Sequence, residues 1–233
     1  MKEIGCNASN YRAGRTMAVE YIVMHYVGAL GGAEDNANYY ANHANASAHY
    51  FVGFDGEIVQ SVKESDTAWH CGGGLQGSGG AAFYKKCLNS NSIGIEMCVR
   101  KRSTETMSAA DKDWYFEEKT VEAAQGLVRE LMERYGIESG HVIRHYDVTG
   151  KICPAPYVQD EEQWQRFKEG LEEMTGREIY EKLREYLKTQ TIPTWAEKEL
   201  QEAIEAGITD GEDPMELIPR YQAAIMAKRA TEK

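Results

Sequence analysis

The chain has 233 residues, of which 42% are hydrophobic and 27% charged, a composition typical of a globular protein with one full domain and a smaller appendage. Its 26 basic and 37 acidic residues give a formal net charge of −11, without a basic run of the kind that binds phosphate backbones. No apolar run reaches roughly 18 residues. We therefore expect no nucleic-acid partner and no insertion into a membrane.

The first segments predict a strand followed by a helix. Residues 20–27 (EYIVMHYV) form a β-branched and aromatic run, which is typical of a strand, and His25 is its odd member. A glycine-rich turn follows. A short helix is then expected over residues 35–43, with Asp35 or Asn36 as its N-cap.

A hairpin and another strand are expected next. Residues 48–54 and 57–62 flank Asp55-Gly56, and Asp-Gly between two apolar runs is the strongest short-range signal of a β-hairpin. After a glycine-rich loop, residues 92–99 (SIGIEMCV) alternate well enough to predict a strand.

The following segments predict two helices around a short strand. Residues 117–135 carry apolar side chains at helical spacing, and Gly136 fits the position where a glycine ends such a helix. Val142 and Ile143 indicate a strand, and residues 159–174 indicate a second helix. Because helices and strands alternate while two strands form a hairpin, we expect an α/β fold with a mixed central β-sheet flanked by helices.

The character of the chain changes after Gly176. Residues 177–187 are amphipathic, a linker follows, and residues 195–206 and 215–229 predict two more helices around a glycine-containing turn. We therefore expect a main domain over residues 1–176 and a small C-terminal helical unit over residues 177–233.

Two histidines and a cysteine suggest a metal site. His25 lies inside an apolar strand, where an imidazole is costly unless its nitrogens have partners. His145 and Cys153 are eight residues apart in a segment that Pro154 and Pro156 stiffen, near enough to share one ion. A single buried histidine is more often a satisfied core residue, but the three together favour a metal.

The ligand set favours a catalytic zinc ion over a structural one. Three protein ligands of nitrogen and sulfur type, with a fourth position left to water, describe a catalytic zinc site. A structural zinc would need a fourth protein ligand, and the sequence offers none beside these three.

Five ordered motifs within about residues 18–160 resemble one enzyme family: IVMHYVG, SAHYFVGFDGEIVQSV, AWHCGG, NSNSIGIEMCV and RHYDVTGKICPAPYV. They are similar to the amidase-2 type N-acetylmuramoyl-L-alanine amidases, a group that includes phage endolysins and is related in fold to peptidoglycan recognition proteins. The resemblance implies zinc-dependent hydrolysis of the amide bond between N-acetylmuramic acid and L-alanine in bacterial peptidoglycan.

The resemblance also implies roles for individual residues. His25, His145 and Cys153 fall on the family's zinc ligands. Glu96 falls on the acidic residue that many members use as general base, although a strand residue facing solvent is the alternative. Lys151 falls on the lysine that stabilises the developing oxyanion, although most lysines are simply surface residues.

Other positions bear on substrate binding. Some phage lysozyme-type members use a tyrosine where this chain has Ala48. The role of that tyrosine is therefore absent here and falls to Glu96. By resemblance Trp69 and His70 line the substrate groove, with His49 as a further candidate. For each of the three, a core aromatic or satisfied histidine is about as plausible.

The C-terminal unit resembles a single S-layer-homology-like repeat of the sort appended to endolysins. The matching residues are Pro193-Thr194-Trp195-Ala196, Gly207-Ile208-Thr209-Asp210-Gly211 and Pro219-Arg220-Tyr221. The unit would then anchor the enzyme to the cell wall. A helical hairpin that packs on the catalytic domain or forms a homodimer is the alternative.

Two rival functions remain at this point. A non-catalytic peptidoglycan recognition module would share the fold, but such proteins typically lose the cysteine ligand that Cys153 supplies here. A thiol hydrolase could use His70 with Cys71, or Cys98, although neither cysteine lies in a recognisable nucleophile turn.

The N-terminal segment lacks the apolar stretch of a secretory signal peptide. We therefore expect the enzyme to accumulate in the cytoplasm and to act on the cell wall once a holin-type lesion releases it, as in a phage or prophage lysin. A bacterial autolysin with unusual export is the alternative.

Overall fold

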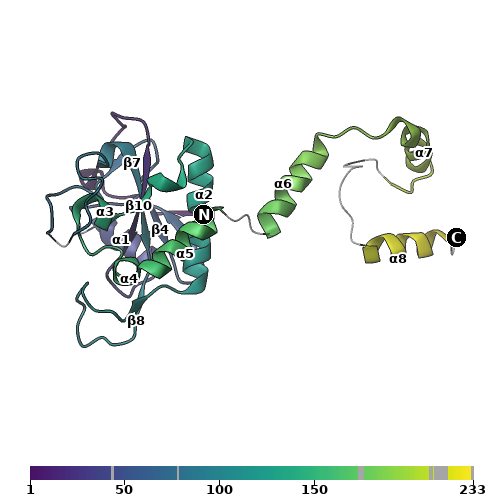
Figure 1. Cartoon of the computed structure of the whole chain (residues 1–233). Helices are drawn as coiled ribbons and strands as arrows, with labels where there is room; N and C mark the ends of the chain where they lie inside the picture. The colour runs from purple at the N-terminus through teal and green to yellow at the C-terminus, as the bar shows by residue number, and fades with distance from the viewer. Residues whose placement is uncertain (43–44, 78, 173–175, 210–211, 213–219, 232–233) are drawn as a thin grey trace. The chain divides into compact units, whose positions relative to one another are not determined.

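A computed structural model describes residues 1–42, 45–77, 79–172, 176–209, 212 and 220–231 (Figure 1). The chain divides into two compact units, residues 1–173 and residues 174–233. The strands described in the first unit are β1 (Lys2–Glu3), β2 (Tyr11–Arg12), β3 (Tyr21–Tyr26), β4 (Tyr50–Val52), β5 (Ile58–Gln60), β6 (Thr67–Ala68), β7 (Ser92–Met97), β8 (Arg100–Lys101), β9 (Trp114–Tyr115) and β10 (Val142–Arg144). Its α-helices are α1 (Ala33–Asn42), α2 (Glu118–Tyr135), α3 (His145–Thr149), α4 (Ala155–Gln159) and α5 (Glu161–Glu172).

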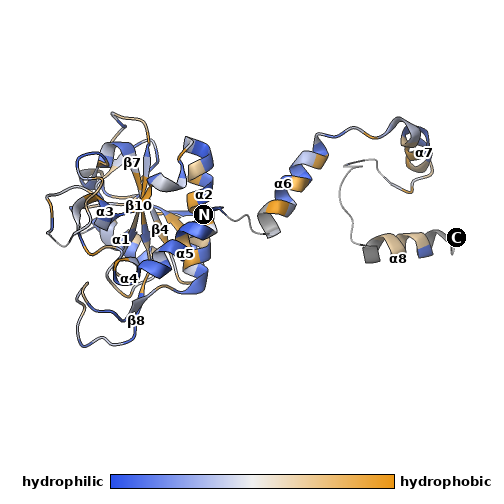
Figure 2. Cartoon of the chain, in the orientation of Figure 1, coloured by the Kyte–Doolittle hydropathy of each residue, from blue (hydrophilic) through white to orange (hydrophobic). Residues whose placement is uncertain are grey.

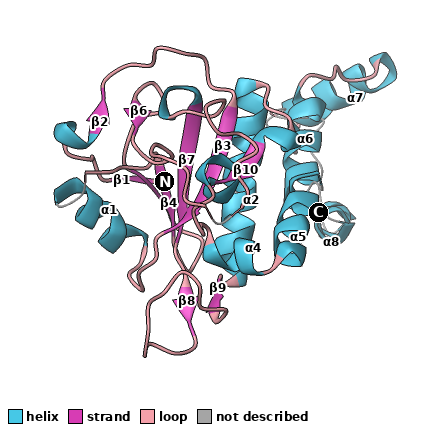
Figure 3. Ribbon diagram, turned by 60° about the vertical axis from the view of Figure 1, so that its left-hand side comes forward, coloured by secondary structure: helices cyan, strands magenta, loops and turns pink. Residues whose placement is uncertain are grey.

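The main sheet is mixed, as the sequence predicted. Its six strands lie in the order β1-β5-β4-β7-β3-β10 (Figure 3). Only β4 and β5 pair antiparallel, because the Asp55-Gly56 turn joins them directly, and Gly56 adopts a φ of 83° there. The neighbours β4, β7, β3 and β10 all pair parallel. These four strands therefore end at the same edge of the sheet.

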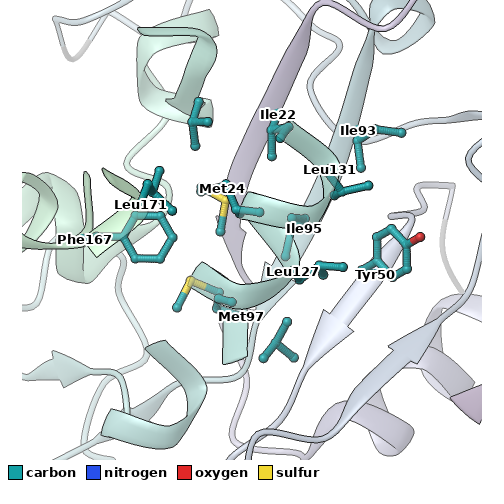
Figure 4. Packing of buried hydrophobic residues seen from close by; sticks show 14 of the residues in the cluster. Ile22, Met24, Tyr50, Ile93, Ile95, Met97, Leu127, Leu131, Phe167 and Leu171 are labelled. Carbon is teal, nitrogen blue, oxygen red and sulfur yellow. The ribbon is translucent and has the colours of Figure 1, made fainter. Parts of the chain in front are cut away.

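One face of the sheet packs against α2 and α5 (Figure 4). Side chains alternate between the two faces of a strand, so Ile22 and Met24 of β3 and Ile93 and Ile95 of β7 point into this core. The core cluster also contains Ala124, Leu127, Val128 and Leu131 of α2 and Trp164, Phe167 and Leu171 of α5.

Helix α2 confirms its sequence signals. Its buried residues recur at helical spacing along the face that covers the sheet. Gly136 ends the helix with a φ of 65°, and its backbone N–H donates to the carbonyl of Met132. Glycine adopts this left-handed conformation without the Cβ penalty of other residues, which explains why the helix stops there.

The predicted cap of α1 was wrong. The helix begins at Ala33, two residues before the earlier of the two expected caps. Asp35 lies in the first turn, where its carboxylate accepts from the backbone N–H of Gly32 at 3.1 Å. Asn36 is buried and its amide donates to the carbonyls of Gly31 and Gly32. Both side chains thus stabilise the start of the helix by hydrogen bonds to backbone groups of the residues that precede it.

Several short elements escaped the sequence prediction. The pairs β2–β6 and β8–β9 form small antiparallel ribbons of two residues per strand, too short to show any periodicity. The segment expected as one helix over residues 159–174 is interrupted at Asp160, whose extended backbone (φ −139°) separates α4 from α5.

The second unit contains α6 (Gly176–Lys188), α7 (Thr194–Glu205) and α8 (Arg220–Thr231). Helix α6 carries apolar and charged side chains side by side (Figure 2), and Ile179 and Leu183 remain more than 40% exposed. Residues 210–211 and 213–219, which include Asp210, Gly211 and Pro219 of the expected repeat, lie outside the described residues.

Candidate metal centre and active site

His25 and Glu96 lie side by side on the face of the sheet opposite α2. His25 is the penultimate residue of β3, Glu96 is the penultimate residue of β7, and the parallel register pairs them directly. Both side chains are buried, with 2% and 7% exposed. In open α/β sheets, ligand sites form at the carboxyl ends of parallel strands, and this pair lies at that edge.

The loop after β10 brings His145 and Cys153 to the same place. His145 begins α3 directly after the strand, and Gly150 ends that helix with a φ of 78°. The chain then folds back, so that the backbone N–H of Tyr146 donates to the carbonyl of Cys153 at 2.9 Å. Two residues eight positions apart are thereby held together by local backbone hydrogen bonds.

A buried ion pair holds this loop. The guanidinium of Arg144 donates to both carboxylate oxygens of Asp147 at 3.0 Å, and to Glu161 and the carbonyl of Tyr157. The Arg144 side chain is only 9% exposed, so its charge is compensated by these partners. This arrangement fixes the start of α3, where His145 lies.

His25, His145 and Cys153 form a group that could hold a metal ion. Their ligand atoms all lie within 4.8 Å of one another, and Cys153 Sγ is 3.6 Å from His25 Nδ1. All three residues are buried. The Nδ1 atom of His145 has no hydrogen-bond partner among the described residues, which is costly for a buried nitrogen and is what a metal-binding nitrogen requires. The donor set therefore fits a metal ion.

Burial keeps the two imidazoles neutral. Burial, with smaller contributions from Lys151 and the neighbouring imidazoles, lowers the pKa of His25 well below its usual value and that of His145 to about 3. A neutral imidazole is the form that binds a metal. The pKa of the Cys153 thiol is raised instead of lowered: burial and the nearby Glu96 raise it to about 12. A bound cation would have to displace that proton.

Glu96 is a buried carboxyl group with an unsatisfied atom. Burial raises its pKa to about 8, against a smaller opposing effect of Lys151. Its Oε2 atom has no partner among the described residues. A carboxyl group whose pKa lies near neutrality can both accept and return a proton, which is the property of a general base.

A small hollow of about 180 Å³ joins these groups. It is lined by His25, Tyr26, Val27, Gly28, Tyr40, Ala46, Ser47, Trp69, His70, Glu96, Lys151 and Cys153. The structure thus brings the expected metal ligands His25 and Cys153 together with Glu96 and Lys151. Tyr26 and Tyr40 were not predicted: the first only follows His25 in sequence, and the second had no signal that separates it from other helical tyrosines.

Comparison with known proteins identifies the family. The sequence pattern of the N-acetylmuramoyl-L-alanine amidases matches residues 15–156. The chain belongs to this amidase family. The match includes each of the residues that form the hollow.

Individual relatives agree with this assignment. CwlL of Bacillus licheniformis, named as an N-acetylmuramoyl-L-alanine amidase, is 34% identical over 171 residues, which are 70% of this chain and 44% of that protein. BlyA of Bacillus subtilis, named likewise, is 30% identical over 175 residues, which are 71% of this chain and 44% of that protein. The chain therefore spans less than half the length of these relatives.

A solved structure matches the catalytic part. The catalytic domain of XlyA, a Bacillus subtilis amidase, aligns with a TM-score of 0.53 and 28% identity. The alignment covers 73% of this chain and 99% of that domain. The expected α/β fold is therefore confirmed as that of amidase catalytic domains.

His70 contacts His25 in addition to lining the hollow. Its Nδ1 is 3.0 Å from Nε2 of His25, and its Nε2 is 3.1 Å from the hydroxyl oxygen of Ser92. Both ring nitrogens are thus engaged within the protein. His70 lines the hollow, but its polar atoms have these partners already.

His49 is an interior residue, contrary to its expected place in the substrate groove. Its side chain is 0% exposed. Nδ1 accepts from the backbone N–H of Gly94 at 2.9 Å, while Nε2 lies 2.7 Å from an Arg15 nitrogen. β4 and the chain before it are central in the sheet, so the residue is covered on both sides. In this arrangement His49 has no access to a substrate.

Trp69 keeps the exposure that substrate contact requires. It is 38% exposed and lines two adjoining hollows, the one beside Glu96 and a neighbouring one of about 400 Å³. Cys71 and Cys98 are buried and neither lines the hollow that contains Glu96 and Lys151. Neither cysteine named in the thiol-hydrolase alternative therefore lines this hollow.

Removing the carboxyl group of Glu96 should change how the stability of the metal-free protein depends on pH. With a pKa of about 8 in the folded chain against 4.5 ordinarily, Glu96 holds a proton in the native state that the unfolded chain has lost between these values. Its contribution to the free energy of unfolding therefore falls as pH rises from about 4.5 to about 8. Relative to the unaltered chain, Glu96→Gln should become progressively more stable across this window.

Urea unfolding in the presence of a chelator would measure this difference. Glu122→Gln, at an exposed position of α2, removes the same group outside the hollow and should shift stability by a constant amount. A pH-independent difference for Glu96→Gln would contradict the raised pKa.

Proposed function

We propose that this chain is a zinc-dependent hydrolase of the amide bond between N-acetylmuramic acid and L-alanine in peptidoglycan. The proposal is supported by its membership in the amidase family and by the CwlL and BlyA relatives. The observation that carries it is the buried His25–His145–Cys153 group, two members of which, His25 and Cys153, line one hollow together with Glu96. A recognition module would need no general base at this position.

His25, His145 and Cys153 would hold the zinc ion. Two imidazole nitrogens and one thiolate are ligands that zinc prefers, and three protein ligands leave one position open. When bound, zinc polarises a carbonyl oxygen and lowers the pKa of a coordinated water.

Glu96 would move the proton during hydrolysis. A buried carboxylate with a free oxygen accepts a proton from the attacking water and returns it to the departing amine of L-alanine. Its raised pKa makes both transfers energetically accessible near neutral pH. The same group can therefore serve as base in the first step and as acid in the second.

Lys151 would stabilise the negative charge on the carbonyl oxygen. Lys151 lines the hollow together with Glu96 and Cys153. A cation in a partly dry site stabilises a developing oxyanion more than it would in water. Trp69, at the rim, offers a flat apolar face to a sugar ring or to the peptide stem.

The biological setting that we propose is that of a phage or prophage endolysin acting on the cell wall. A related solved structure, 28% identical to this chain, is described as an endolysin from Bacillus subtilis. Among the described residues, no helix has the length and apolar character needed to cross a bilayer.

Substitution of a metal ligand and substitution of the general base should have different effects on zinc binding and turnover. We expect Glu96→Gln to retain stoichiometric zinc while kcat/KM falls by about 10²–10⁴-fold, because the proton acceptor is lost and the ligands are not. Cys153→Ala should lose both zinc and turnover. Zinc content by atomic spectroscopy and release of L-alanine amino termini from purified walls would measure the two effects, with Glu122→Gln as control.

Two results would count against the proposal. Full turnover by Glu96→Gln would remove the role of the base. Zinc-loaded, unaltered protein that releases no L-alanine amino termini would favour the recognition module, and new reducing sugars without new amino termini would indicate a different bond.

The C-terminal unit would serve wall binding or dimerisation. Trp195 on α7 is 76% exposed, which leaves an aromatic side chain available to a ligand or a second chain. After deletion of residues 190–233, we expect turnover on soluble muropeptides within about twofold of the full chain and loss of co-sedimentation with intact walls. Retained wall binding with a change from dimer to monomer, measured by light scattering, would favour dimerisation instead.

A further inference from the structure

A chain of hydrogen-bonding groups runs behind His25. Nε2 of His25 is 3.0 Å from Nδ1 of His70, and Nε2 of His70 is 3.1 Å from the hydroxyl oxygen of Ser92. That hydroxyl is 2.6 Å from the backbone carbonyl of Leu88. The chain begins at a metal-binding side chain and ends at a group that can only accept a hydrogen bond.

The carbonyl at the end determines the direction of every bond. The carbonyl oxygen of Leu88 can only accept a hydrogen bond, so the Ser92 hydroxyl must donate to this oxygen. The oxygen of Ser92 then accepts from His70 Nε2–H, and Nδ1 of His70 accepts from His25 Nε2–H. A neutral imidazole carries one proton, so Nδ1 of His25 is left with a free lone pair.

That lone pair lies on the side where the other ligand atoms are. Nδ1 of His25 is the atom 3.6 Å from Cys153 Sγ. The tautomer and the orientation of the ring are therefore both those of a metal ligand.

Strand β7 leaves space for the side chain of His70. Ser92, Gly94 and Glu96 are two residues apart and share the face that His25 occupies on β3. A Cβ atom on Gly94 would lie 2.5 Å from Cγ of His70, closer than packed atoms come, so only glycine leaves room for the ring. One strand face thus anchors His70, makes space for it and presents the carboxyl group of Glu96.

We infer that His70 and Ser92 are positioning residues that hold His25 with its Nδ1 lone pair directed at the metal. This inference rests on the proposed zinc site. It assigns His70 a role behind the metal ligand in addition to its place in the wall of the hollow.

Zinc affinity, measured by competition with a chromogenic chelator, tests the inference without reference to turnover. His70→Ala should weaken zinc binding by about 10–100-fold, the usual effect of losing a partner of a ligating histidine. His70→Asn should recover much of that loss, because its side-chain oxygen can accept near the position of Nδ1. Ser92→Ala should weaken binding less than His70→Ala, since His25 keeps its direct partner.

Matched controls separate this effect from general damage. His141→Ala removes an exposed imidazole of the same unit and should leave zinc affinity unchanged. Thermal unfolding of each metal-free variant reports whether the domain folds. Equal zinc affinity of folded His70→Ala and the unaltered chain would overturn the inference and leave the proposed function standing. Failure of the unaltered chain to bind zinc would overturn both.

A second, independent feature is a pair of cysteines on the same side of the sheet. Cys71 and Cys87 are both buried, belong to one core cluster and line the 400 Å³ hollow beside Trp69. Each thiol perturbs the pKa of the other, and Cys71 Sγ lies 3.6 Å from the hydroxyl oxygen of Ser92. Six glycines lie between them in the sequence, which makes the intervening segment adaptable.

The two thiols differ in character. Hydrogen bonding from Cys87 holds the pKa of Cys71 well below its usual value, while the same contact and burial raise the pKa of Cys87. Cys71 is therefore the thiol that more readily supplies a thiolate, which is the form that attacks a disulfide.

We propose that Cys71 and Cys87 are a redox modification site that forms a disulfide with a low-molecular-weight disulfide as oxidant. The Cys71 thiolate attacks one sulfur of the oxidant and releases one thiolate product. Cys87 then loses its proton and attacks the Cys71 side of the mixed disulfide, which releases the second product. The two cysteines lose two electrons and two protons, and the oxidant is reduced to two thiols.

Peptide mass analysis tests this site in the full chain. Folded protein would be treated with glutathione disulfide, blocked with iodoacetamide and digested with trypsin, which cleaves after Lys85 and Lys86 and so separates Cys71 from Cys87. We expect one cross-linked pair of peptides, lighter by two hydrogens than their sum. The Cys87 peptide also contains Cys98, so Cys98→Ser should keep the cross-link and Cys87→Ser should lose it.

Other products would overturn the second proposal. Carbamidomethylated Cys71 and Cys87 after the treatment would show that the thiols do not react, and separate glutathione adducts on each would show that they cannot reach one another.

Discussion

The parallel pairing of β3 with β7 is the constraint on which the rest of the site depends. In this register His25 stands beside Glu96, while Met24 and Ile95 beside them point to the opposite face. A one-residue shift of one strand against the other would put either His25 or Glu96 on the apolar face under α2 and separate the two side chains. The apolar packing that stabilises the sheet therefore also holds His25 and Glu96 in position.

Burial gives this site its chemical character. It disfavours charge on every member, so the imidazoles of His25 and His145 are neutral while Glu96 and Cys153 tend to keep their protons. A divalent cation among them would reverse part of this preference, because it attracts the thiolate and the carboxylate. The donor group is thus arranged to accept a positive charge that the protein itself does not supply.

The rigid elements around the hollow differ in how they are held. β3 and β7 pair with each other along their whole length, whereas the His145–Cys153 loop depends on Arg144 and on local backbone hydrogen bonds. The exposed rim at Trp69 adjoins the glycine-rich segment that follows it. The buried side chains of the hollow thus lie beside a glycine-rich rim.

The sequence by itself determined the elements that have strong local signals. The Asp55-Gly56 hairpin, the periodic face of α2 and the glycine that ends it are each specified by neighbouring residues, and the structure contains them. The candidate ligands His25, His145 and Cys153 were also apparent, because a histidine in an apolar strand and a His-x₇-Cys segment are unusual locally. The structure brings all three within reach of one ion.

Only the tertiary structure decided the roles of the remaining histidines. His49 and His70 look alike in sequence, each beside an aromatic residue, yet one is enclosed by the sheet and the other reaches across Gly94 to His25. Such contacts join residues 45 positions apart, and no local pattern records them. Partners of this kind depend on which strands become neighbours, and that is settled by packing of the whole domain.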